Sequence, residues 1–116
     1  MAYLMLIVEP VGQRAERGLE DGREAYARMQ AFAAGLEARG ALRGVNALKT
    51  PATRLQRHGD GGTLVLDGPF AETKEMLGGY FLLDGVTRDE ALAIAADCPA
   101  AAWATIELRE TGTCYE

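Results

Sequence analysis

The sequence predicts an α+β fold of the ferredoxin-like type, and three observations support this. Short apolar runs typical of strands alternate with segments that have helical periodicity. Their order is strand, helix, strand, hairpin, strand, helix, strand, which is βαββαβ with an extra hairpin. At 116 residues the chain is long enough for one domain with one core. We expect this domain to span residues 1–110 and residues 111–116 to form a C-terminal tail.

The first half of the chain predicts a strand, a long helix and a second strand. Residues 3–8 are continuously apolar, as in a strand buried on both faces, and the polar residues 11–19 predict a loop. From about Leu19 to Arg39, apolar residues recur at spacings of three and four, which predicts an amphipathic helix. Its expected apolar face consists of Tyr26, Met29, Phe32, Ala33 and Leu36. Residues 41–48 predict the second strand.

The second half predicts the remaining strands and a second helix. Four strands are expected, at residues 53–57, 63–66, 80–83 and about 103–109. The first two would form a hairpin across the turn Asp60-Gly61-Gly62. Thr87 and Glu90 have the spacing of a capping box, so a helix is expected to begin there and to end at Cys98-Pro99.

Composition and charge exclude some partners. The net charge of −5, with no cluster of basic residues, argues against binding to nucleic acid. No apolar stretch approaches the roughly 18–20 residues needed to cross a membrane. Two cysteines are too few for a disulfide framework, so we expect a reduced, cytoplasmic protein. Two helices on one face of the sheet would leave its other face apolar and uncovered, which predicts a homodimer that packs sheet against sheet.

The stretch from Asp67 to Tyr80 holds the candidate site, because charged residues and glycines interrupt two apolar strands there. We expect Asp67 to be the catalytic or anchoring carboxylate. The candidate ligand-binding residues are Phe70, Glu72, Lys74, Glu75 and Tyr80. The alternative is structural: Asp67-Gly68-Pro69 would build a turn, and the other charges would form a solvated surface. The sequence leaves both interpretations open.

Other polar and special residues carry weaker predictions. His58, the only histidine, has no second His or Cys at ligand spacing, so no metal site is expected. Cys98 is expected to pack as a small apolar residue, and Gly78-Gly79 to allow a bulge or a close approach of the backbone. No pattern for a cofactor is present, and we expect none.

The residues DGPFAETKE at positions 67–75, followed by Gly78-Gly79-Tyr80-Phe81, resemble the DGPF-motif branch of the YCII-related family. The similarity extends over almost the whole chain, including Thr50-Pro51-Ala52-Thr53 and Cys98-Pro99-Ala100. The resemblance implies a dimeric α+β barrel in which two ferredoxin-like subunits enclose a cleft. It also implies small bacterial proteins, often encoded beside extracytoplasmic-function sigma factors, most of which have no established activity.

The wider family is credited with a His–Asp catalytic pair, and one branch is linked to dehalogenation of an aromatic compound. In that pattern the histidine lies near the first strand–helix junction, whereas His58 lies beside the hairpin turn. Asp67 can be carried over from the pattern, but its histidine partner cannot.

Three functions therefore remain open for this sequence. The first is a cofactor-independent enzyme acting on a small organic molecule, with Asp67 as base. The second is a module that binds such a molecule without chemistry, and the third is a non-catalytic partner in a sigma-factor-linked regulatory pathway. An enzyme needs a closed pocket around the carboxylate, whereas a binding module should tolerate Asp67→Asn.

Overall fold

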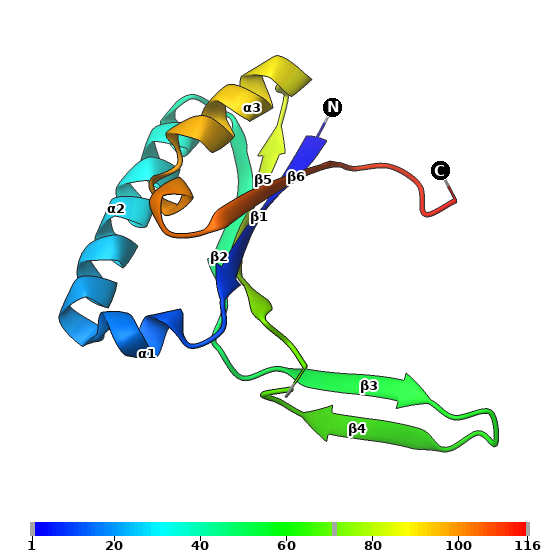
Figure 1. Cartoon of the computed structure of the whole chain (residues 1–116). Coiled ribbons are helices and arrows are strands. Elements are labelled where there is room, and N and C mark those ends of the chain that lie inside the picture. The colour runs from blue at the N-terminus through cyan, green and yellow to red at the C-terminus, as the bar shows by residue number, and fades with distance from the viewer. Residues whose placement is uncertain (1, 71, 116) are drawn as a thin grey trace.

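Four strands form one antiparallel sheet in the order β2-β5-β1-β6 (Figure 1). These strands are β1 (Ala2–Pro10), β2 (Leu42–Ala47), β5 (Glu75–Asp84) and β6 (Thr105–Glu110). The other elements are α1 (Gln13–Arg17), α2 (Leu19–Ala38), α3 (Arg88–Asp97), a 3-10 turn (Pro99–Ala102) and the separate hairpin β3 (Thr53–Arg57) and β4 (Thr63–Asp67). The computed structural model describes residues 2–70 and 72–115; Met1, the motif residue Ala71 and the tail residue Glu116 lie outside the described residues. The predicted ferredoxin-like arrangement with an extra hairpin is confirmed.

The helices cover one face of the sheet and leave the other face bare (Figure 1). On β1, Tyr3, Met5 and Ile7 point to the helices and are almost completely buried, while the alternating residues between them are only half-buried. Phe81 and Leu83 on β5 extend this core. The hairpin β3–β4 projects from one end of the sheet toward the side of the bare face (Figure 1).

The structure corrects the sequence-based elements at four points. Residues 11–19, expected to be a loop, include the short helix α1. Tyr26, expected in the core, is 54% exposed, and Ala25 is buried in its place. Strand β5 begins at Glu75, well before residue 80, because Glu75, Met76 and Leu77 continue the pairing with β1 on the other side of Gly78 and Gly79. In this single chain β1 is buried on its helical face only.

The predicted bulge and capping box are both present. The register between β1 and β5 shifts between Ile7 and Val8, opposite Gly79. At the start of α3, the backbone amide of Glu90 donates to Thr87 Oγ1 at 3.1 Å, and the Thr87 amide donates to Glu90 Oε1 at 3.0 Å. The hydrogen bond from the Thr87 backbone, followed by that with the Thr87 hydroxyl, lowers the pKa of Glu90 below its ordinary value.

We expect Thr87→Ala to lower the free energy of unfolding by about 1 kcal/mol, because one amide of the first turn of α3 loses its acceptor. The lowered pKa of Glu90 means that its ionised form favours the folded state. This contribution is present above the pKa of an unfolded glutamate and is lost as the pH falls through the folded pKa. Chemical denaturation at neutral and acidic pH measures both effects. Thr87→Ser, which keeps the hydroxyl, is the control and should behave like the wild type.

Among the described residues, no helix combines the length and the apolar character that a membrane span requires.

Candidate functional site

A cleft of about 1000 Å³ lies between α2 and the sheet. This volume is at the upper end of the range of roughly 300–1,000 Å³ that is usual for small-molecule sites. Side chains of α2 form one wall, and residues of β1, β2 and β5 form the other. Much of the lining is apolar, with Ile7, Met29, Ala33, Val45 and Phe81 among its residues.

One end of this cleft holds a buried carboxylate. Glu9 continues the alternation of Tyr3, Met5 and Ile7 on β1, so its side chain points to the helical side of the sheet. The residue is 4% exposed. Its Oε1 accepts a hydrogen bond of 2.6 Å from Arg14 Nε, which also makes the two an ion pair. A buried carboxylate is costly unless it is paired, and Arg14 supplies the pairing charge.

Arg14 is itself fixed by one carbonyl oxygen just after the end of β2 and by another inside β5. Its Nη1 donates to the carbonyl oxygen of Leu48 at 2.7 Å, and its Nη2 donates to that of Gly78 at 3.1 Å. Arg14 comes from α1, which is separated from α2 by Gly18 with a φ of 84°. That left-handed conformation favours glycine and allows the chain to turn between the two helices. The guanidinium therefore joins the ends of β1 and β2 to an inner residue of β5.

Gly78 makes room for this ion pair. A Cβ at Gly78 would overlap the Glu9 carboxylate and would lie 2.9 Å from Arg14 Nη2. A Cβ at the next residue, Gly79, would lie 2.9 Å from the carbonyl oxygen of Asn46. The predicted close approach of this backbone is thus confirmed, and its consequence is that Glu9 and Arg14 can occupy the end of the cleft.

The arrangement can recognise a ligand that is mainly apolar and carries a hydrogen-bond donor. The cleft walls would bury the apolar part, and the Glu9 carboxylate would accept from a hydroxyl or N–H group. Arg14 holds Glu9 in one orientation, which lowers the entropy that would be lost on binding.

The predicted anchor Asp67 lies outside this lining. Asp67 is exposed, and its Oδ1 accepts a hydrogen bond of 2.6 Å from Thr53 Oγ1 across the hairpin. Phe70 and Glu72 both contact Arg54, through its stacking on the Phe70 ring at 3.9 Å and an ion pair of 3.5 Å with Glu72. The structure therefore places these three residues at the base of the hairpin.

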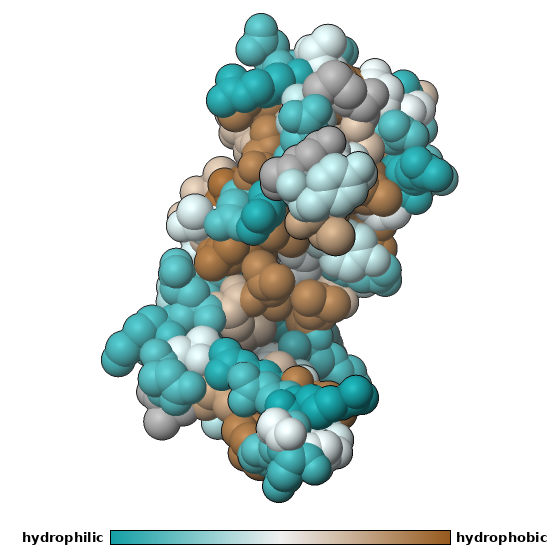
Figure 2. Space-filling view, turned by 90° about the vertical axis from the view of Figure 1, so that its right-hand side faces the viewer, coloured by the Kyte–Doolittle hydropathy of each residue, from teal (hydrophilic) through white to brown (hydrophobic). Residues whose placement is uncertain are grey.

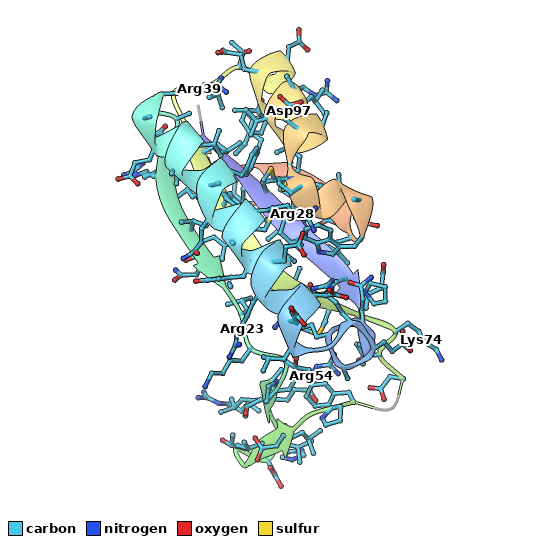
Figure 3. All side chains as sticks on the ribbon, turned by 90° about the vertical axis from the view of Figure 1, so that its left-hand side faces the viewer. Arg23, Arg28, Arg39, Arg54, Lys74 and Asp97 are labelled. Atoms are coloured by element: carbon cyan, nitrogen blue, oxygen red, sulfur yellow. The ribbon has the colours of Figure 1, made fainter. Side chains whose placement is uncertain are left out.

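Of the three remaining predicted residues, two are exposed to solvent and one lines the cleft. Lys74 and Glu75 are exposed, and Lys74 points away from α2 (Figure 3). Tyr80, in contrast, is one of the residues that line the cleft, and its hydroxyl accepts a hydrogen bond of 2.7 Å from Asn46 Nδ2. Of the predicted site residues, Tyr80 is thus the one that the structure brings to the cleft.

The sequence analysis missed Glu9 and Arg14, although a signal was present. Residues 3, 5, 7 and 9 alternate along one strand, so Glu9 had to share the face of three large apolar side chains. The continuous apolar run of residues 3–8 predicts burial on both faces and hides this alternation. In the family pattern a histidine is expected near this first strand–helix junction, and here the junction holds Glu9 and Arg14.

Cys98 and His58 lie in surroundings that do not indicate a catalytic or metal-binding role. Cys98 is buried as predicted, its Sγ lies 3.9 Å from Met29 Sδ, and burial raises the pKa of its thiol. His58 is exposed at the hairpin turn. No group of three or more His, Cys, Asp or Glu among residues 2–70 and 72–115 is arranged to hold a metal ion.

The chain is similar in sequence to a known protein and in fold to a solved structure. An uncharacterized protein of Rhizobium meliloti (strain 1021) is 54% identical over 48 residues, which are 41% of this chain. The match spans 39% of that relative's length. A solved structure, 5-chloro-2-hydroxyhydroquinone dehydrochlorinase (TftG) from Burkholderia phenoliruptrix AC1100 in complex with 2,5-dihydroxybenzoquinone, superposes with a TM-score of 0.56. At 16% identity over 97% of this chain and 94% of that one, this likeness concerns the fold alone.

The family comparison covers nearly the whole molecule. The YCII-related domain matches residues 1–111, which include every strand and helix described above. The DGPF-motif branch stays a prediction. The chain belongs to the family of proteins with a YCII-related domain.

Proposed function

We propose that this protein binds a small, hydroxylated aromatic or quinone-like molecule in the cleft between α2 and the sheet. The observation that carries the proposal is the buried Glu9 carboxylate, which Arg14 orients at one end of a largely apolar cleft. The cleft would enclose the ring of the ligand, and Glu9 would accept a hydrogen bond from its hydroxyl group. Tyr80 would contribute a second polar contact.

The fold neighbour supports this choice of ligand class. That neighbour is a 5-chloro-2-hydroxyhydroquinone dehydrochlorinase, and its structure is a complex with 2,5-dihydroxybenzoquinone. An oriented carboxylate beside an acidic hydroxyl can also act as a general base, so the same site suits cofactor-independent proton abstraction. In either case Glu9, and not Asp67, would be the residue that contacts the ligand.

Titration with hydroquinone, whose phenolic hydroxyl groups stay protonated at neutral pH, tests the proposal when it is followed by NMR chemical shifts and calorimetry. We expect shift changes along α2 and at residues 78–81. Glu9→Gln should weaken binding about 10- to 100-fold, because a hydrogen bond to a charged acceptor is replaced by one to a neutral amide. Asp67→Asn is the matched control, and its affinity should equal that of the wild type. Shift changes centred on Asp67 and Thr53, or loss of binding in Asp67→Asn alone, would overturn the assignment.

We also propose that two chains associate through the bare face of the sheet. Leu4, Leu6 and Val8 on β1 and Leu82 on β5 alternate with the core residues and are half-buried in the single chain. Figure 2, which looks onto this side, shows hydrophobic residues gathered over its middle and continuing toward the hairpin. A contiguous apolar surface of this kind marks an interaction site.

A further inference from the structure

The short hairpin β3–β4 carries three large apolar side chains that are exposed to solvent. Leu55 is 66% exposed and Val65, its cross-strand partner, is 54% exposed; Leu66, on the opposite face, is 46% exposed. A two-stranded hairpin is only marginally stable by itself in water. This one nevertheless extends well away from the four-stranded sheet (Figure 1). We therefore expect the exposed pair Leu55 and Val65 to pack against another surface.

The charged stretch that the sequence singles out fixes the base of this hairpin. Asp67 and Thr53 are joined by a 2.6 Å hydrogen bond, and the amide of Gly68 donates to the carbonyl oxygen of Ala52 at 2.6 Å. Arg54 stacks on Phe70, forms an ion pair with Glu72 and donates a hydrogen bond to Thr73 Oγ1. These contacts connect strands β3 and β4 to the segment that leads into β5. They limit the directions in which the hairpin can point.

We propose that the hairpin is an arm that clasps a second copy of this chain and buries Leu55 and Val65 against it. The arm projects on the side of the bare sheet face, so a partner seated on that face would meet the arm (Figures 1 and 2). The inference thus rests on the dimer proposed above. Under two-fold symmetry each chain gives one arm and receives one, which closes the assembly at two subunits.

Charge also favours a second copy as the occupant. The hairpin segment 53–67 contains two arginines and two aspartates, so it is neutral with His58 uncharged. The whole chain has a net charge of −5. A neutral hairpin can contact a second acidic chain without the electrostatic repulsion that arises between two acidic surfaces. In this inference the residues Asp67, Phe70 and Glu72 have a positioning role, because they set the direction of the arm.

Sedimentation equilibrium over a range of concentrations tests the arm. The variant Leu55→Thr/Val65→Thr places a β-branched residue that favours strands at both positions and removes the apolar pair. We expect its dimer dissociation constant to rise about 10- to 100-fold, given the apolar area lost from the interface. Leu92→Gln is the control, because Leu92 is an exposed leucine on α3, is 42% exposed, and lies outside both surfaces. Its dissociation constant should not change.

The outcomes separate the arm from the dimer. Equal dissociation constants for the wild type and the arm variant would overturn the arm and leave the sheet-face dimer standing. A wild type that stays monomeric at every concentration would overturn both. Amide hydrogen exchange on the wild type gives a second readout that needs no variant. Residues 53–67 should be protected in concentrated protein and lose that protection on dilution, and protection that does not depend on concentration would contradict the proposal.

Discussion

Arg14→Ala is expected to lower the free energy of unfolding by about 2–4 kcal/mol, the range for a charge left unpaired in a mostly buried site. The change would leave the Glu9 carboxylate, 4% exposed, without its guanidinium. It would also remove the donors to the carbonyl oxygens of Leu48 and Gly78. The Arg14 side chain is 36% exposed, so water can enter its place and solvate the Glu9 carboxylate in part. The expected loss of stability is therefore smaller than the largest losses known for broken buried pairs.

Urea denaturation measures this effect. The proteins to compare are the wild type, Arg14→Ala, Arg43→Ala and the double variant Glu9→Gln/Arg14→Ala. Arg43→Ala is the matched control, because Arg43 pairs with Asp84 at 3.3 Å while their side chains are 66% and 46% exposed. A surface pair of this kind contributes about 0–1 kcal/mol. The double variant Glu9→Gln/Arg14→Ala should be more stable than Arg14→Ala alone, since it leaves no unpaired charge. Similar losses for Arg14→Ala and Arg43→Ala would show that burial does not strengthen the Glu9–Arg14 pair.

The fold could be predicted from the sequence because its signals are local. The helical periodicity of residues 19–38, the capping box at Thr87 and the turn at residues 60–62 each act over a few residues. The short helix α1 was missed because five residues give no measurable period and its start lacks a side-chain cap. Tyr26 was misplaced because periodicity gives the direction of a helix face but not which of two neighbouring residues lies deeper.

The candidate site was harder to predict because it depends on contacts between distant residues. Arg14 meets Leu48 and Gly78 only after three strands have come together, and no local pattern encodes that meeting. A dense run of charges such as residues 67–75 attracts attention in a sequence, yet charges that gather in a loop can be fully solvated. A single carboxylate that follows an apolar strand in phase is the stronger indication, because its burial has to be compensated by a partner.

Gly78→Ala is expected to lower the free energy of unfolding by about 2–3 kcal/mol, through overpacking, and to abolish ligand binding at Glu9. The φ of Gly78 is not in the left-handed region, so the backbone tolerates alanine, and only the missing space opposes it. The new methyl group would occupy the position of the Glu9 carboxylate and force it away from Arg14. Gly35→Ala is the control: its Cβ on α2 meets open space, and the change should raise the free energy of unfolding by about 0.5–1 kcal/mol. Calorimetry measures ligand binding by both variants, and thermal unfolding measures their stability. If Gly78→Ala binds the ligand as the wild type does, the geometry of the Glu9–Arg14 pair is not what the ligand recognises.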